Sequence, residues 1–112
     1  MKIKVKGNGK GVLCYQAGNH LAFVESNLKQ AKTHLAAGDR QAASKDLWQA
    51  WGRASEARDY VQDVETVSVI QKKAGDLAKD LAKKIPKDVQ VRMKSLCDLT
   101  KKISSKALKA CK

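Results

Sequence analysis

The residues of this sequence with the clearest chemical potential are its lysines, and their positions are more informative than their number. The 112-residue chain holds 23 lysines and arginines against 11 acidic residues, which gives a net charge of +12. Residues 71–112 contain thirteen basic residues against four acidic ones, and residues 1–12 contain four lysines and no acid, whereas residues 13–70 are nearly neutral. Basic residues gathered at both ends of a chain favour a polyanionic partner such as nucleic acid.

Seven lysines in the second half of the chain recur at spacings that place them on the outer faces of helices. At about 100° per residue, Lys72, Lys79 and Lys83 fall on one stripe opposite the apolar residues of their segment. Lysine is a point charge without the planar fork of arginine, so we expect phosphate contacts of weak sequence specificity, to DNA or RNA. No aromatic residue lies beyond residue 70, so base stacking is not expected there. The predicted nucleic-acid-binding residues are Lys72, Lys79, Lys83, Lys94, Lys101, Lys102 and Lys109.

The residue types typical of catalysis and metal binding do not form a usable set. His20 and His34 are fourteen residues apart, which is about 21 Å along one helix and too far for a shared site. Gly9-Lys10 is not followed by the Ser or Thr of a P-loop. No CxxC pair of the kind that binds zinc occurs among the three cysteines, Cys14, Cys97 and Cys111. We therefore expect a protein that is not an enzyme and holds no metal or cofactor.

The sequence also favours a cytoplasmic location. No hydrophobic core of a signal peptide follows Met1, and no run approaches the ~20 apolar residues of a membrane span. An odd number of cysteines suits a reducing compartment in which thiols stay free. The apolar stripes lack the aromatic anchors of interfacial helices, so a membrane partner is not expected.

The spacing of apolar residues predicts an all-α protein built as an antiparallel helical bundle over residues 18–112. Apolar residues recur every three or four positions from Leu21 to Leu35, which predicts the first helix. Gly38 is expected to end that helix in the left-handed conformation, and Asp39 to cap the next one. A last helix is expected after Pro86, with its apolar stripe at Val89, Met93, Leu96, Leu99, Ile103 and Ala107.

Residues 39–85 admit two interpretations. Their lack of proline and their single pair of glycines favour one continuous helix of about 70 Å, with the other helices packed back along it. Such a three-helix layer would bury little and would favour a homodimer. The β-branched residues of segment 64–70 favour instead a break near residues 59–66 and a four-helix bundle. The absence of turn residues makes the continuous helix the preferred prediction.

Residues 1–17 are expected to form a short basic arm or a β-hairpin. Charged and apolar residues alternate over segment 2–6, which is the two-residue period of a strand. Asn8-Gly9 is a strong hairpin turn signal, and segment 12–15 could supply the return strand.

Two tryptophans lie three residues apart in the neutral part of the chain. Trp51 falls on the apolar stripe and is expected in the core, whereas Trp48 falls on its flank and is expected to be partly exposed. An exposed tryptophan is a common anchor of protein contacts. The second functional hypothesis is therefore a helical adaptor or inhibitor that docks on an acidic protein or a ribonucleoprotein machine. Small basic proteins of mobile elements would fit either hypothesis.

Overall fold

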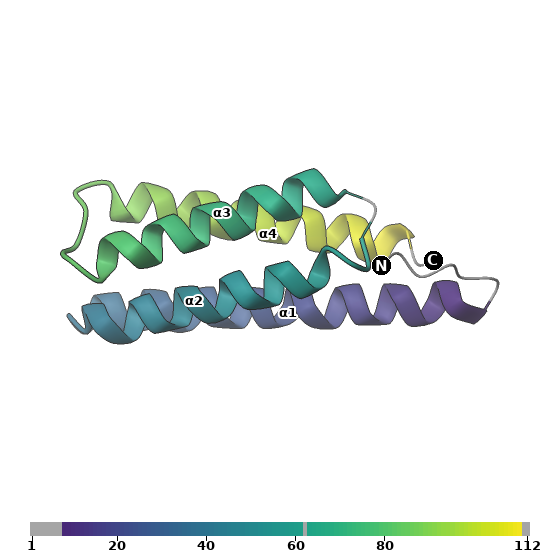
Figure 1. Ribbon diagram of the computed structural model, residues 1–112, viewed down its shortest axis with the longest axis horizontal. Coiled ribbons are helices and arrows are strands. Elements are labelled where there is room, and N and C mark those ends of the chain that lie inside the picture. Colours follow the sequence, from purple (N-terminus) through teal and green to yellow (C-terminus); the bar gives the residue numbers. More distant parts are fainter. Residues whose placement is uncertain (1–7, 62, 111–112) are drawn as a thin grey trace.

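The structure is a computed structural model that describes residues 8–61 and 63–110, with side chains described for residues 17–61 and 63–104. Four helices make up these residues: α1 (Asn8–Ala36), α2 (Arg40–Ala57), α3 (Val64–Leu81) and α4 (Val89–Ala110). Consecutive helices run antiparallel, with α1 and α2 in one layer and α3 and α4 in the other (Figure 1). Because α1 packs on α2 and α4, and α3 packs on the same two helices, the four form a ring around one core. The predicted all-α antiparallel bundle is confirmed.

The turn between α1 and α2 follows the local signals of the sequence. Gly38 has a φ of +79°, and the N–H of Asp39 reaches back to the carbonyl of His34 at 2.8 Å. This is the hydrogen bond that closes a helix at a left-handed glycine. The carboxylate of Asp39 then accepts a hydrogen bond from the N–H of Ala42 at 3.1 Å. Both predicted capping roles are confirmed.

The long central segment is broken, so the preferred prediction of one continuous helix is wrong and the four-helix alternative holds. α2 ends at Ala57, and the N–H of Tyr60 closes a tight turn on the carbonyl of Ala57 at 3.0 Å. Asp63 then starts α3, because its carboxylate accepts hydrogen bonds from the N–H of Thr66 at 3.0 Å and from the Thr66 hydroxyl at 2.7 Å. An N-cap with this geometry starts a new helix without any glycine or proline.

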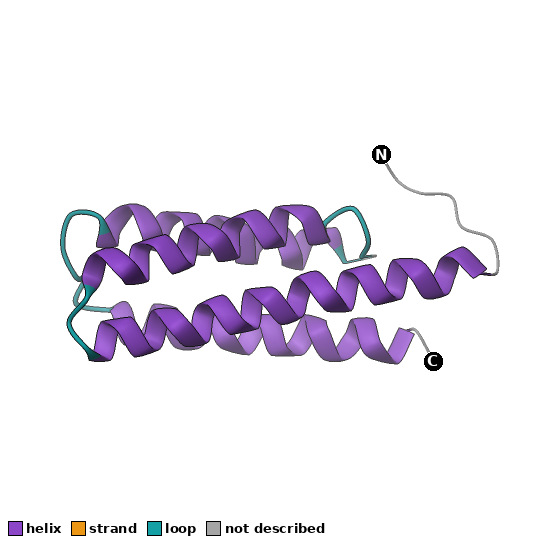
Figure 2. Ribbon diagram, turned by 90° about the horizontal axis from the view of Figure 1, so that it is seen from below, coloured by secondary structure: helices purple, strands orange, loops and turns teal. Residues whose placement is uncertain are grey.

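Neither the predicted arm nor the predicted β-hairpin over residues 1–17 is supported where the structure describes that segment. α1 begins at Asn8, so the proposed turn at Asn8-Gly9 and the return strand over segment 12–15 are helical. Ala17 is buried with Leu21 and Val24, which shows that the apolar stripe of α1 starts earlier than expected. The lysine-rich segment 2–6 lies outside the described residues. The amino-terminal end of α1 extends beyond the other helices (Figures 1 and 2).

The core is aliphatic, and Trp51, which was expected in it, lies outside together with Ile85. Trp51 is 39% exposed and Ile85 is 46% exposed. Ile85 lies beyond the end of α3 at Leu81, outside the apolar stripe of that helix. The buried face of α2 consists largely of alanine, and the indole of Trp51 lies instead against Gly75 of α3. The largest fully buried side chains are Leu21, Leu28, Leu47, Ile70, Leu77, Leu81, Met93 and Leu96.

A homodimer was expected only for a three-helix layer that buries little surface, and the four helices instead form a ring around one core. Dimerisation stays a prediction. None of the described helices combines the length and the apolar character needed to cross a membrane.

Candidate nucleic-acid interface

The predicted lysines lie on more than one surface of the bundle. Lys101 of α4 lies against α1, and Lys94 belongs to the same side because it is two helical turns earlier. Lys102 lies about 100° further around α4, away from that side. Lys72 and Lys79 share the outer face of α3, and Lys83 follows just after its end. The side chain of Lys109 lies outside the described residues.

The side of α4 that faces α1 contains a groove of about 360 Å³, which we call the α1–α4 groove. Lys29 and Lys32 of α1 line it opposite Lys101 and Cys97 of α4, and Leu28 lies between them. Glu25 is the acidic residue in its lining. Three lysines from two helices therefore line one groove. Of these three, only Lys101 was predicted from the sequence.

Lys29 and Lys32 were missed because they lie in the part of the sequence that is neutral on average. Most of the acids that balance their charge along the chain belong to α2, α3 and the turns beside them, and Glu25 is the one on α1. Only the pairing of the first helix with the last brings them to Lys101. A four-helix up-and-down topology predicts that pairing, since its first and last helices are neighbours in the ring.

The thiol of Cys97 lies in the wall of this groove. Burial raises the pKa of the Cys97 thiol, while the nearby positive charges of Lys32 and Lys101 oppose that shift. The thiolate is the nucleophilic form of cysteine, so a raised pKa makes a poor nucleophile. Cys97 thus contributes a half-buried thiol to the wall of the groove.

Two of the predicted lysines are paired with acids on their own helices. Lys72 lies 3.5 Å from Asp76, and Lys94 lies 3.1 Å from Asp98. All four side chains are at least half exposed, and exposed pairs of this spacing contribute only a few tenths of a kcal/mol. A phosphate can therefore replace the carboxylate at little cost. Within the described part of the chain, no ion pair engages Lys79, Lys83, Lys101 or Lys102.

The α2–α3 side carries a different surface. Trp48 is 39% exposed, which confirms its predicted partial exposure, and its ring meets that of Trp51 edge to face with centroids 5.8 Å apart. Both indoles lie over Gly75 of α3, where a Cβ atom would stand only 3.0 Å from Cδ1 of Trp51. We call the surface formed by Trp48, Trp51 and Gly75 the tryptophan surface.

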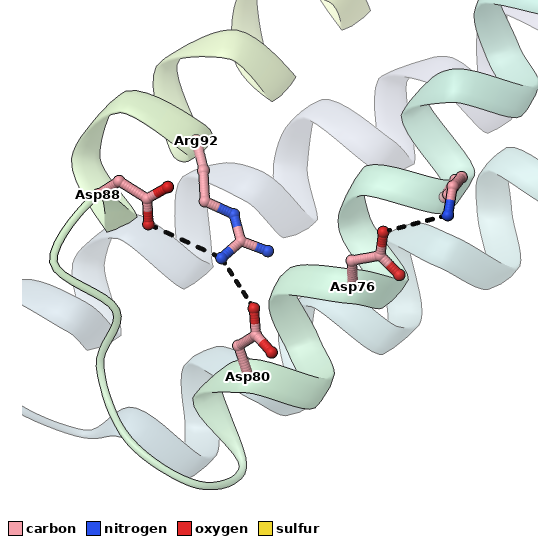
Figure 3. A network of polar contacts seen from close by, with 5 residues as sticks. Asp76, Asp80, Asp88 and Arg92 are labelled. Atoms are coloured by element: carbon pink, nitrogen blue, oxygen red, sulfur yellow. Dashed lines mark hydrogen bonds and ion pairs between the residues drawn. The ribbon is translucent and has the colours of Figure 1, made fainter.

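The remaining two sides of the ring are occupied by internal pairs. Between α1 and α2 lies an amide-lined groove of about 670 Å³, where the guanidinium of Arg53 stacks 4.1 Å above the ring of Phe23 and lies 3.6 Å from Glu56. Between α3 and α4, Arg92 bridges Asp80 at 2.8 Å and Asp88 at 3.8 Å (Figure 3). Both arginines are engaged by acids.

A polar pair also connects α1 to α2. Nδ1 of His34 lies 2.6 Å from the carboxylate of Asp46, which is almost buried.

Among the described side chains, no three histidines, cysteines or acids gather closely enough to hold a metal ion. No family model, curated protein or solved structure matches the chain.

Proposed function

We propose that this protein binds nucleic acid without catalysing a reaction on it, by placing lysine ammonium groups against the phosphate backbone. The observation that carries the proposal is the convergence of Lys29, Lys32 and Lys101 on the α1–α4 groove. Lys94 extends this row along α4 by two helical turns, about 10 Å. The exposed lysines of α3 add to the positive field that draws a polyanion toward the molecule.

The chemistry of lysine defines the kind of binding. An ammonium group offers charge without the bidentate geometry that reads a base edge, so contacts are made mainly to phosphate oxygens. Such binding releases counterions, and its logarithm falls linearly with the logarithm of salt concentration, by about 0.9 for each phosphate neutralised on a duplex. Four engaged lysines therefore correspond to a slope of about −3.6.

The proposal is tested by salt titrations of binding to mixed-sequence duplex DNA, single-stranded DNA and structured RNA. The informative variant replaces Lys29, Lys32 and Lys101 by Gln, and it should bind more weakly, with a slope shallower by about 0.9 for each phosphate that is no longer neutralised. The matched control replaces Lys73, Lys84 and Lys87 by Gln, which removes the same charge from exposed positions outside the groove. Equal weakening in the two variants would show that net charge, rather than the groove, drives binding. Absence of binding to all three ligands at ~50 mM salt would reject the proposal, since electrostatic binding is strong under these conditions.

A further inference from the structure

The tryptophan surface has three features that the lysine faces do not explain. Two indole rings are partly exposed side by side, and an edge-to-face contact between them fixes their relative orientation. The absence of a side chain at Gly75 lets Trp51 lie directly across the backbone of α3. The bundle thus presents a preformed aromatic platform rather than two independent side chains.

The charged side chains next to this platform are mostly lysines; the acids beside them are Asp76, which pairs with Lys72, and Asp39, which lines a groove together with Lys45 and Trp48. On an α-helix, side chains three or four positions apart are neighbours on the surface. The charged residues at those distances from Trp48, Trp51 and Gly75 are Lys45, Lys72 and Lys79. All three are exposed, and the pair of Lys72 with Asp76 is a weak surface pair. The platform therefore lies between a lysine of α2 and two lysines of α3.

From this arrangement we infer that the tryptophan surface stacks against the bases of single-stranded nucleic acid while Lys45, Lys72 and Lys79 contact its phosphates. Base faces are covered by their neighbours in a duplex and become available only in a single strand. Aromatic side chains within a positively charged groove are the usual means of binding single strands without sequence preference. The inference adds a ligand class to the proposed function and depends on it.

A protein partner fits this surface less well. Each partner in a stable protein complex buries about 800 Å², and two indoles that are each 39% exposed supply only a small part of such an area. A nucleobase, by contrast, needs a single ring face and one nearby cation for its phosphate. Size and charge together favour the nucleotide.

The ring of helices also separates this surface from the α1–α4 groove. The groove lies between the first and last helices, and the tryptophan surface lies between the second and third, on the opposite side of the bundle. Variants of one site therefore leave the other intact, and the two contributions to binding can be measured independently.

The chain itself supplies the reporter for the experiment, since Trp48 and Trp51 are its only tryptophans. We would titrate the full chain at ~50 mM salt with a 12-nucleotide oligothymidine and with a 12-base-pair duplex, following tryptophan emission and fluorescence anisotropy of end-labelled ligands. The oligothymidine should quench the emission and the duplex should not. Trp48→Leu should weaken oligothymidine binding about 5- to 150-fold, the range that corresponds to the loss of one base-stacking contact, and leave duplex binding unchanged. Trp48→Phe should restore much of the affinity, because it restores an aromatic face.

Phe23→Leu serves as the matched control, because Phe23 is a similarly exposed aromatic ring on another side of the bundle. It should leave oligothymidine binding unchanged. Oligothymidine binding without quenching, and with equal affinity in Trp48→Leu, would overturn the inference while leaving the proposed function in place. A Trp48-dependent complex with an acidic protein, alongside Trp48-independent oligothymidine binding, would overturn it in favour of protein docking. Failure of every nucleic acid to bind would reject the proposed function and the inference together.

Discussion

The carboxylate of Asp63 holds both the backbone N–H and the hydroxyl of Thr66, and this double contact marks the start of α3. It satisfies a donor at the helix end and fixes the point at which the chain turns back from α2. The architecture of the molecule depends on this turn, because a continuous helix here could not close the ring.

We expect Asp63→Ala to lower the free energy of unfolding by about 0.5–2 kcal/mol, the usual contribution of an N-cap side chain. Asp63→Asn should retain most of the stability, since its amide oxygen can still accept from the Thr66 N–H. Urea denaturation followed by circular dichroism measures both effects. An unchanged midpoint for Asp63→Ala would show that the turn is held by other contacts.

The two glycines of the α2–α3 region should respond differently to alanine. Gly75→Ala gains about 1 kcal/mol of helix propensity but forces Trp51 outward, so we expect little net change in stability and a red shift of tryptophan emission. Gly52→Ala meets no atom within 4 Å and should stabilise the fold by up to about 1 kcal/mol without an emission shift. A spectrum unchanged in Gly75→Ala would contradict the close approach of Trp51 to α3.

The thiol of Cys97 should titrate above an ordinary cysteine. Burial raises its pKa in the folded state, so less thiolate is present at any given pH and alkylation is slow. As pH rises through the ordinary cysteine pKa, the unfolded chain loses this proton more readily than the folded chain, and stability decreases. Alkylation rates from pH 7 to 10 in a Cys14→Ser, Cys111→Ser background, with and without urea, measure the effect. Faster alkylation of the folded chain would contradict it.

The bridge made by Arg92 should contribute modestly and depend on salt. Its partners Asp80 and Asp88 are more than half exposed, so Arg92→Ala should cost less than about 1 kcal/mol in dilute buffer. The cost should shrink at 1 M NaCl, where charges are screened within about 3 Å. A double-mutant cycle with Asp80→Ala isolates the electrostatic part. A coupling that does not change with salt would show that Arg92 acts through packing.

The features predicted correctly from the sequence are those determined by neighbours along the chain. The apolar periodicity predicts helices, and Gly38 and Asp39 act within one turn of their own positions. The break before α3 has an equally local signal, Asp63 followed three residues later by Thr66, but the absence of glycine and proline there favours a continuous helix. At the amino terminus, the Asn8-Gly9 turn signal competes with a helical stripe that continues through Ala17, and the helix prevails.

The parts of the site that were not predicted depend on which helices become neighbours. Lys29 and Lys32 join Lys101 only through the packing of α1 against α4. In the same way, Trp48 and Trp51 lie beside the lysines of α3 only because α2 packs against α3. The helix α2 lies outside the basic segment of the sequence. Charge averaged along the sequence cannot reveal such combinations, because it ignores the ring order of the helices.

The α1–α4 groove lies between the first and last helices, so it forms only when segments far apart in the sequence meet. Contacts between consecutive helices form across short connections, whereas Lys32 and Lys101 are separated by roughly 70 residues, so their encounter carries a larger loop-closure entropy than the contacts between consecutive helices. A polyanion that bridges both lysines binds only the closed bundle and therefore shifts the equilibrium toward it. On the proposed function, the ligand would itself help to complete the fold that binds it.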